Sequence, residues 1–135
     1  MFKKLLILPL VIALTTSCST MQKHTAELGQ AADSISTVTF LNMGIEEANP
    51  IIASNLWILI VKPFIPPAIR YLTKGNPEVC RSIDFALSSV GFGAAGWNIG
   101  VMAGGGPIAV FLGLASLGIP YIIGHNPECG DNDLE

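Results

Sequence analysis

The stretch FALSSVGFGAAGWNIGVMAGGGPIAVFLGLASLGIPYIIG, residues 85–124, decides the fold of this chain. It carries no charged residue over about 40 positions, about twice the length that one helix needs to cross a bilayer. Its midpoint, residues 104–107, reads Gly-Gly-Gly-Pro, which is a strong turn signal. We therefore expect a helical hairpin with arms at residues 77–103 and 107–124. We expect it to lie in a membrane, because too little polar sequence remains to cover it in water.

Two segments upstream of this hairpin also predict helices. Residues 50–72 are apolar at their start and are then interrupted by Lys62 and three prolines. Such a helix can still cross, because neighbouring helices repair the hydrogen bonds that proline removes. Residues 26–43 repeat apolar positions at helical spacing and carry an opposing polar face. They fit either a helix on the membrane surface or a span whose polar face packs inward. The expected fold is all-α, a small helical membrane bundle of three or four helices.

The N-terminal residues have the order of an export signal. Two lysines precede a short apolar run, and small residues then lead to Cys18. A cysteine at this place is typical of a lipoprotein signal, in which Cys18 becomes the first mature residue and is acylated, for example by palmitate. An ordinary secretory signal or an uncleaved helix are the alternatives. We expect residues 1–17 to be the signal, residues 18–135 a single membrane domain and residues 125–135 its acidic tail.

The composition excludes several classes of function. Charged residues make up 13% of the chain, against about 25% in a typical soluble domain. The net charge of −3 leaves no basic patch for nucleic acid. Known catalytic motifs, phosphate-binding loops and zinc-ligand spacings are absent from the sequence. We expect no enzymatic activity, no cofactor and no metal site, and the expected partner is the lipid bilayer.

If the first cysteine is acylated, two cysteines remain. In an exported chain Cys80 and Cys129 form a plausible disulfide, and two free thiols are the alternative. With four crossings both cysteines face the outside, together with the exported N-terminus. The positive-inside rule disagrees, because Arg70 and Arg81 would then lie outside. If residues 26–43 only lie on the surface, the chain crosses three times and the cysteines face the cytoplasm.

Asp33 is the candidate functional residue of the first helix. An ionisable group inside a membrane span is costly and is a functional candidate by default. Its carboxylate could bind a cation or relay a proton. The alternative is an aspartate that accepts hydrogen bonds from Ser36, Thr37 or a neighbouring helix.

Gly96, Gly100 and Gly104 repeat at small-xxx-small spacing in the first arm of the hairpin. In an apolar helix this spacing allows another backbone to approach closely. The glycines therefore predict either packing within the monomer or self-association into a homo-oligomer.

Residues 33–37, DSIST, and residues 44–50, GIEEANP, resemble a family of small uncharacterised bacterial and phage integral membrane proteins. In that family the first helix carries an Asp followed by Ser/Thr and ends in Gly, before Glu-x-Asn-Pro. The resemblance implies that residues 26–43 form a true transmembrane helix, and it implies no activity.

Together these patterns predict a small exported membrane protein of structural or interaction type, anchored by lipid at Cys18. Its expected location is the inner membrane of a bacterial envelope, with the N-terminus outside the cytoplasm. An ion- or proton-conducting protein that uses Asp33 is one alternative. A glycine-zipper envelope lipoprotein of the outer membrane is another.

Overall fold

The computed structural model describes residues 18–45 and 57–130, and all regular structure in these two ranges is helical. The predicted signal, the start of the helix predicted at residues 50–72 and the end of the acidic tail lie outside the described residues. The signal and the acylation of Cys18 therefore stay predictions. The all-α helical bundle expected from the sequence is confirmed.

The first half of the described chain forms two helical arms. The short helix α2, Cys18–Lys23, leads into α3, Thr25–Asn42. The second arm begins with α5, Ile58–Val61, continues through the 3₁₀ turn η1, Lys62–Phe64, and ends with α6, Ile65–Thr73. The prolines of this arm cannot donate backbone hydrogen bonds, so a tighter turn joins two α-helical pieces instead of one continuous helix.

The second half forms the expected hairpin. Its first arm is α7, Pro77–Met102, and its second arm comprises α8, Gly106–Leu117, and α9, Ile119–Ile123. Asn76 caps α7, since its side chain accepts a hydrogen bond of 3.2 Å from the Val79 N–H. The reversal between the arms uses glycines at positive φ, which side chains disfavour.

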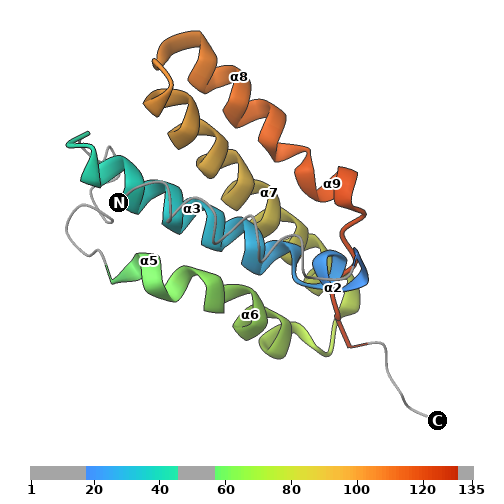
Figure 1. Cartoon of the computed structure of the whole chain (residues 1–135). Coiled ribbons are helices and arrows are strands. Elements are labelled where there is room, and N and C mark those ends of the chain that lie inside the picture. The colour runs from blue at the N-terminus through green and yellow to red at the C-terminus, as the bar shows by residue number, and fades with distance from the viewer. Residues whose placement is uncertain (1–17, 46–56, 131–135) are drawn as a thin grey trace.

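The helices lie side by side in the order α5–α6, α3, α7, α8, and successive arms run in opposite directions (Figure 1). Helix α7 is the centre of the bundle, because α3 packs against it and α8 packs back onto it. Helices α2 and α9 and the start of α7 gather at one end, which also holds Cys80 and Cys129. We call this end the cysteine end.

Glycines allow the closest helix contacts. A Cβ placed on Gly91 of α7 would lie 2.4 Å from the carbonyl carbon of Gly29 in α3. On the α8 side, a Cβ on Gly96 would lie 2.3 Å from Ser116 Oγ, and one on Gly100 would lie 2.3 Å from a backbone atom of α8. Gly96 and Gly100 therefore pack within the monomer.

Gly104 does not continue that packing face. It lies in the hairpin turn at φ +135°, and a Cβ placed there would have no neighbour within 4 Å. The three-glycine stripe expected from the sequence is thus a two-glycine contact followed by a turn, because the helix ends at Met102.

Burial is inverted relative to a bundle that folds in water. Polar side chains share the interior with mostly small apolar ones, and Asp84, Ser88 and Thr37 are at most 1% exposed. Large apolar side chains face outward, and the exposed fraction reaches 70% or more for Ile60, Tyr71, Leu72, Phe111, Tyr121 and Ile122.

Two helical segments among the described residues are long and apolar enough to cross a membrane, Pro77–Met102 and Gly106–Ile123. They are the two arms of the hairpin. Helix α3 is also 18 residues long, but Glu27, Gln30, Asp33 and several hydroxyl residues make it more polar. Those polar residues are on its buried face.

Candidate functional site

The interior of the bundle at the cysteine end holds a cluster of ionisable side chains, formed by Glu27, Arg70, Asp84 and His125. Arg70 on α6 donates from both Nη atoms to the Glu27 carboxylate on α3, at 2.6 and 2.5 Å. Its Nε donates to Asp84 Oδ1 on α7 at 2.8 Å. The Arg70 side chain is 11% exposed and that of Asp84 is not exposed at all. A planar guanidinium with several donors suits this bridging role, which a lysine could not fill.

His125 closes the cluster from the segment that follows α9. Its Nε2 lies 3.3 Å from Asp84 Oδ2, without hydrogen-bond geometry. Its ring meets Phe85 edge-on, with 5.6 Å between the ring centroids. The His125 side chain is only 5% exposed, and burial lowers the pKa of its imidazole although nearby Asp84 favours the protonated form.

Asp33 lies deeper in the bundle and forms an ion pair with Lys62 of η1. Thr37 also donates a hydrogen bond to its Oδ1, at 3.4 Å. The ion pair is largely buried, because the Asp33 side chain is 9% exposed and the Lys62 side chain is 16% exposed. Because the carboxylate already has a cation and a hydroxyl donor, its charge is balanced inside the chain. Of the two roles expected for Asp33, the observed contacts match the internally bonded one.

Uncharged polar groups continue this interior along α3. Gln30 Nε2 donates to the Leu87 carbonyl of α7 at 2.6 Å. Asn98 Nδ2, also on α7, donates to Ser36 Oγ at 3.1 Å and to Thr37 Oγ1 at 3.0 Å. The middle of the polar face of α3, from Gln30 to Thr37, is thus bonded to α7. Without water, such groups need partners inside the protein, and here the neighbouring helix supplies them.

The cysteine end is also tied together covalently. Cys80 at the start of α7 and Cys129 after α9 are joined as a disulfide with 5.7 Å between their Cα atoms. Gln22 of α2 makes two hydrogen bonds in the same region. Its side-chain Nε2 donates to the Ile123 carbonyl, and its backbone carbonyl accepts from the Asn126 N–H. Lys23 and Glu128 form an exposed ion pair at 2.5 Å, and this hydrogen bond lowers the pKa of Glu128.

Within the described residues, no group of three or more His, Cys, Asp or Glu side chains could hold a metal ion. Glu27, Asp33 and Asp84 each already have a cationic partner. The chemistry that this arrangement provides is the pairing of buried and partly buried charges with opposite charges on neighbouring helices.

Sequence reasoning found Asp33 but missed most of its surroundings. Asp84 and His125 flank the uncharged stretch, and Lys62 and Arg70 lie within residues 50–72, so none of them is marked as a partner of another by its place in the sequence. Their pairing depends on which helices become neighbours, and spacing along the chain does not reveal that. One available signal was the position of Lys62 and Arg70, which stand inside an otherwise apolar segment.

No known protein family, no curated protein and no solved structure matches this chain.

Proposed function

We propose that this chain is an integral membrane protein of the cell envelope with a structural or interaction role. The inverted burial carries the proposal, because buried Asp84, Ser88 and Thr37 contrast with an outer surface of large apolar side chains. In water that surface would be costly, and in lipid it matches the solvent. The two arms of the hairpin supply two crossings, and the paired polar face of α3 allows a third helix to join them.

The proposed topology has four crossings, with the cysteine end outside the cytoplasm. Successive arms run in opposite directions, so the start of α3, the end of α6, the start of α7 and the end of α9 share one side (Figure 1). The Cys80–Cys129 pair lies on that side, where an oxidising compartment would keep it bonded. Exposed Tyr71 and Tyr121 fit a membrane interface. Acylation at Cys18 would add an anchor on the same side.

Labelling of single introduced cysteines tests this topology. Gly75→Cys places a thiol in the loop before α7, where a Cβ meets no neighbour within 4 Å. Ala103→Cys places one near the hairpin turn at the opposite end. In intact spheroplasts, a membrane-impermeant maleimide should label Gly75→Cys, whereas Ala103→Cys should react only after permeabilisation. The reverse pattern would mean three crossings, and extraction of the protein by alkaline carbonate would rule out insertion.

A second candidate function is proton or ion conduction along the interior. The observation in its favour is a set of buried hydroxyls, those of Ser34 and Ser88, which have no hydrogen-bond partner in the described part of the chain. Ser34 follows Asp33, and Ser88 lies one turn beyond Asp84. Purified protein in liposomes would show a proton leak that Asp33→Asn abolishes while insertion persists. The structural role ranks first because Lys62 already neutralises Asp33.

A further inference from the structure

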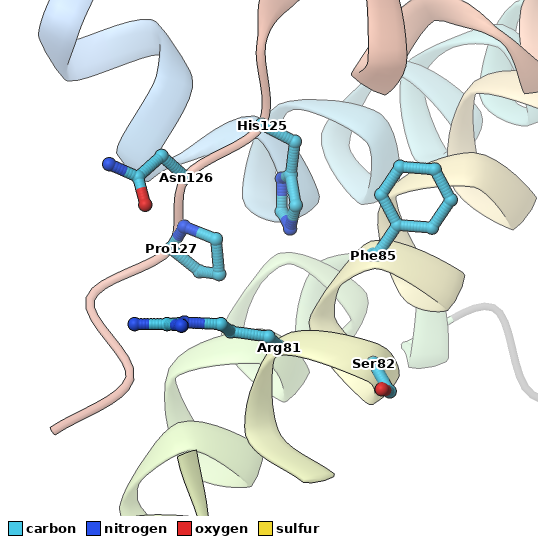
Figure 2. A pocket seen from close by; sticks show the side chains of 6 residues that line it. All are labelled: Arg81, Ser82, Phe85, His125, Asn126 and Pro127. Carbon is cyan, nitrogen blue, oxygen red and sulfur yellow. The ribbon is translucent and has the colours of Figure 1, made fainter. Parts of the chain in front are cut away.

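The segment that follows α9, residues 125–129, runs alongside the start of α7, and we call it the strap (Figure 2). At its beginning the His125 N–H donates to the Pro120 carbonyl of α9 at 2.9 Å. At its end Cys129 is bonded to Cys80 of α7. The strap is thus attached to both helices, and its attachment to α7 is a covalent bond that a reductant can break.

The bonded strap buries the imidazole of His125, which Figure 2 shows directed towards α7 beside Phe85. The side chain is 5% exposed, and within the described residues neither Nδ1 nor Nε2 has a hydrogen-bond partner. A protonated imidazole donates from both nitrogens and needs two acceptors. Asp84 Oδ2 lies 3.3 Å from Nε2 but already accepts a hydrogen bond from Arg70 Nη2. The bonded strap therefore favours the neutral ring.

Charged and titratable groups surround the strap on several helices. They are Asp84 and Arg81 on α7, Arg70 on α6, Glu27 and the preceding His24 at the start of α3, and Glu128 of the strap with its partner Lys23 on α2. Burial has the largest effect on the ring and lowers the pKa of His125, and Arg70 acts in the same direction. Asp84 and Glu27 act in the opposite direction, but both are bonded to Arg70.

A pocket of about 590 Å³ lies beside the ring, between α7 and the strap. Its lining residues are Arg81, Ser82, Phe85, His125, Asn126 and Pro127. The strap therefore borders open space on this side instead of a packed helix. If the bond to Cys80 is broken, the strap can move away from α7 without displacing another element, and the ring then reaches water.

We propose that the Cys80–Cys129 bond and the protonation of His125 oppose each other, so that the strap makes the cysteine end a joint sensor of redox state and pH. The bonded strap keeps the ring buried and neutral. Reduction by a dithiol breaks the S–S bond and transfers two electrons and two protons, so the protein gains two thiols and the dithiol closes its own disulfide. The released ring then binds one further proton from water in acid.

This coupling is reciprocal by linkage. If the bond favours the neutral ring, the protonated ring disfavours the bond by the same factor. A fall in pH below about 6.5 should therefore shift the equilibrium towards the reduced protein through His125. Only the place of the sensor, outside the cytoplasm, rests on the proposed function.

Proton NMR in detergent measures the effect of the bond on the ring. The chain has two histidines, so His24→Gln leaves the signal of His125 alone. The pKa of His125 should rise towards the ordinary value of about 6.5 when the bond is reduced, and likewise in Cys129→Ser. A His125→Phe chain supplies the matched control, because the half-exposed His24 should titrate alike in both redox states. Circular dichroism of the same samples should show that the helices persist.

The converse effect is measured in buffers of reduced and oxidised dithiol between about pH 8 and pH 5. The labels gained by thiol-specific reagent report the equilibrium constant for reduction. Dividing the wild-type constant by that of His125→Phe at each pH cancels the pH dependence of the thiols and the reagent. This ratio should rise by about fivefold across the range, the lower end of common coupling between sites. His24→Gln should follow the wild type.

Two results would overturn the coupling, an unchanged pKa of His125 after reduction and equal pH dependence of wild type and His125→Phe. Loss of the helices on reduction would also overturn it, because the bond would then hold the whole bundle together and not the strap alone. None of these results bears on membrane topology, since both measurements are made in detergent. Labelling of Gly75→Cys decides the topology separately.

Discussion

Arg70 Nε on α6 lies 2.8 Å from Oδ1 of Asp84 on α7, and the Asp84 side chain is completely buried. The same guanidinium holds Glu27 of α3. One side chain thus connects three helices, and its partners lie 43 residues before it and 14 residues after it in the sequence. The fully buried Asp84 and the partly buried Glu27 both bond to this one cation, so the contact should dominate the stability of the cysteine end.

Arg70→Met should destabilise the protein strongly, by about 3–5 kcal/mol, because it leaves the fully buried Asp84 without its hydrogen-bonded cation. The free energy of unfolding in a mild detergent measures the effect. Lys74→Met, four residues along and exposed, serves as the matched control and should change stability by less than about 0.5 kcal/mol. If Arg70→Met were as mild as its control, the cluster would not be a structural element.

Asp33 and Lys62 should behave as one unit. Asp33→Asn alone leaves the Lys62 charge buried without its partner. Lys62→Met alone likewise leaves the Asp33 charge buried without its partner. The double variant removes both charges and should recover part of the loss, with a coupling of about 0.5–3 kcal/mol. A double-mutant cycle on unfolding in detergent measures this coupling, and strictly additive effects would contradict the ion pair.

Gly91→Ala should be poorly tolerated. Its Cβ would lie 2.4 Å from the carbonyl carbon of Gly29, so α3 and α7 would have to separate. Overpacking of this kind costs about 1–3 kcal/mol. Gly75→Ala is the control, since a Cβ there meets nothing within 4 Å and should change stability by no more than about 0.5 kcal/mol. Thermal unfolding of both variants compares them, and equal midpoints would argue against a tight α3–α7 contact.

The Cys80–Cys129 pair should be oxidised in protein taken from the envelope. Thiol labelling under denaturing conditions should then gain two labels per chain after reduction. Removal of the bond by Cys129→Ser should cost about 2–5 kcal/mol, because it frees a loop that the disulfide closes. Both thiols reacting before reduction would instead support three crossings, with this end in the cytoplasm.

Acidification should destabilise the protein through His125. Burial lowers the imidazole pKa in the folded state, so the unfolded chain binds more protons below the ordinary value of about 6.5. Stability is therefore full above about pH 6.5 and falls as the pH drops towards the folded-state pKa. The groups that face the ring are Asp84, Arg70 and Glu27, and Arg81 lines the same pocket.

Unfolding free energies between about pH 8 and pH 5 measure this dependence. His125→Phe keeps an aromatic ring against Phe85 but cannot bind a proton, so it should flatten the dependence in the window just below pH 6.5. His24→Gln removes the other histidine, which is 52% exposed and contacts Glu27, and it should leave the loss in place. A rise in stability on acidification would show that Asp84 outweighs burial at this histidine.

The hairpin was predictable because its signals are local. A long uncharged stretch must be buried or placed in lipid. The Gly-Gly-Gly-Pro sequence at its midpoint favours a turn regardless of its tertiary surroundings. The helix ends followed for the same reason, since Asn76 and Pro77 define the start of α7 by their own chemistry. Helix α3 was predicted to within one residue at each end, but its environment stayed open between a membrane surface and a packed interior.

The sequence by itself thus determined the helices, their polar and apolar faces and the turn between the last two. Only the tertiary structure decided that the polar face of α3 turns inward, that Lys62 meets Asp33 and that Arg70 joins Glu27 to Asp84. The physical reason is the distance along the chain over which each kind of interaction acts. Helix formation and turn formation depend on neighbours a few residues away, whereas a buried charge is stable only beside a partner that another helix brings to it.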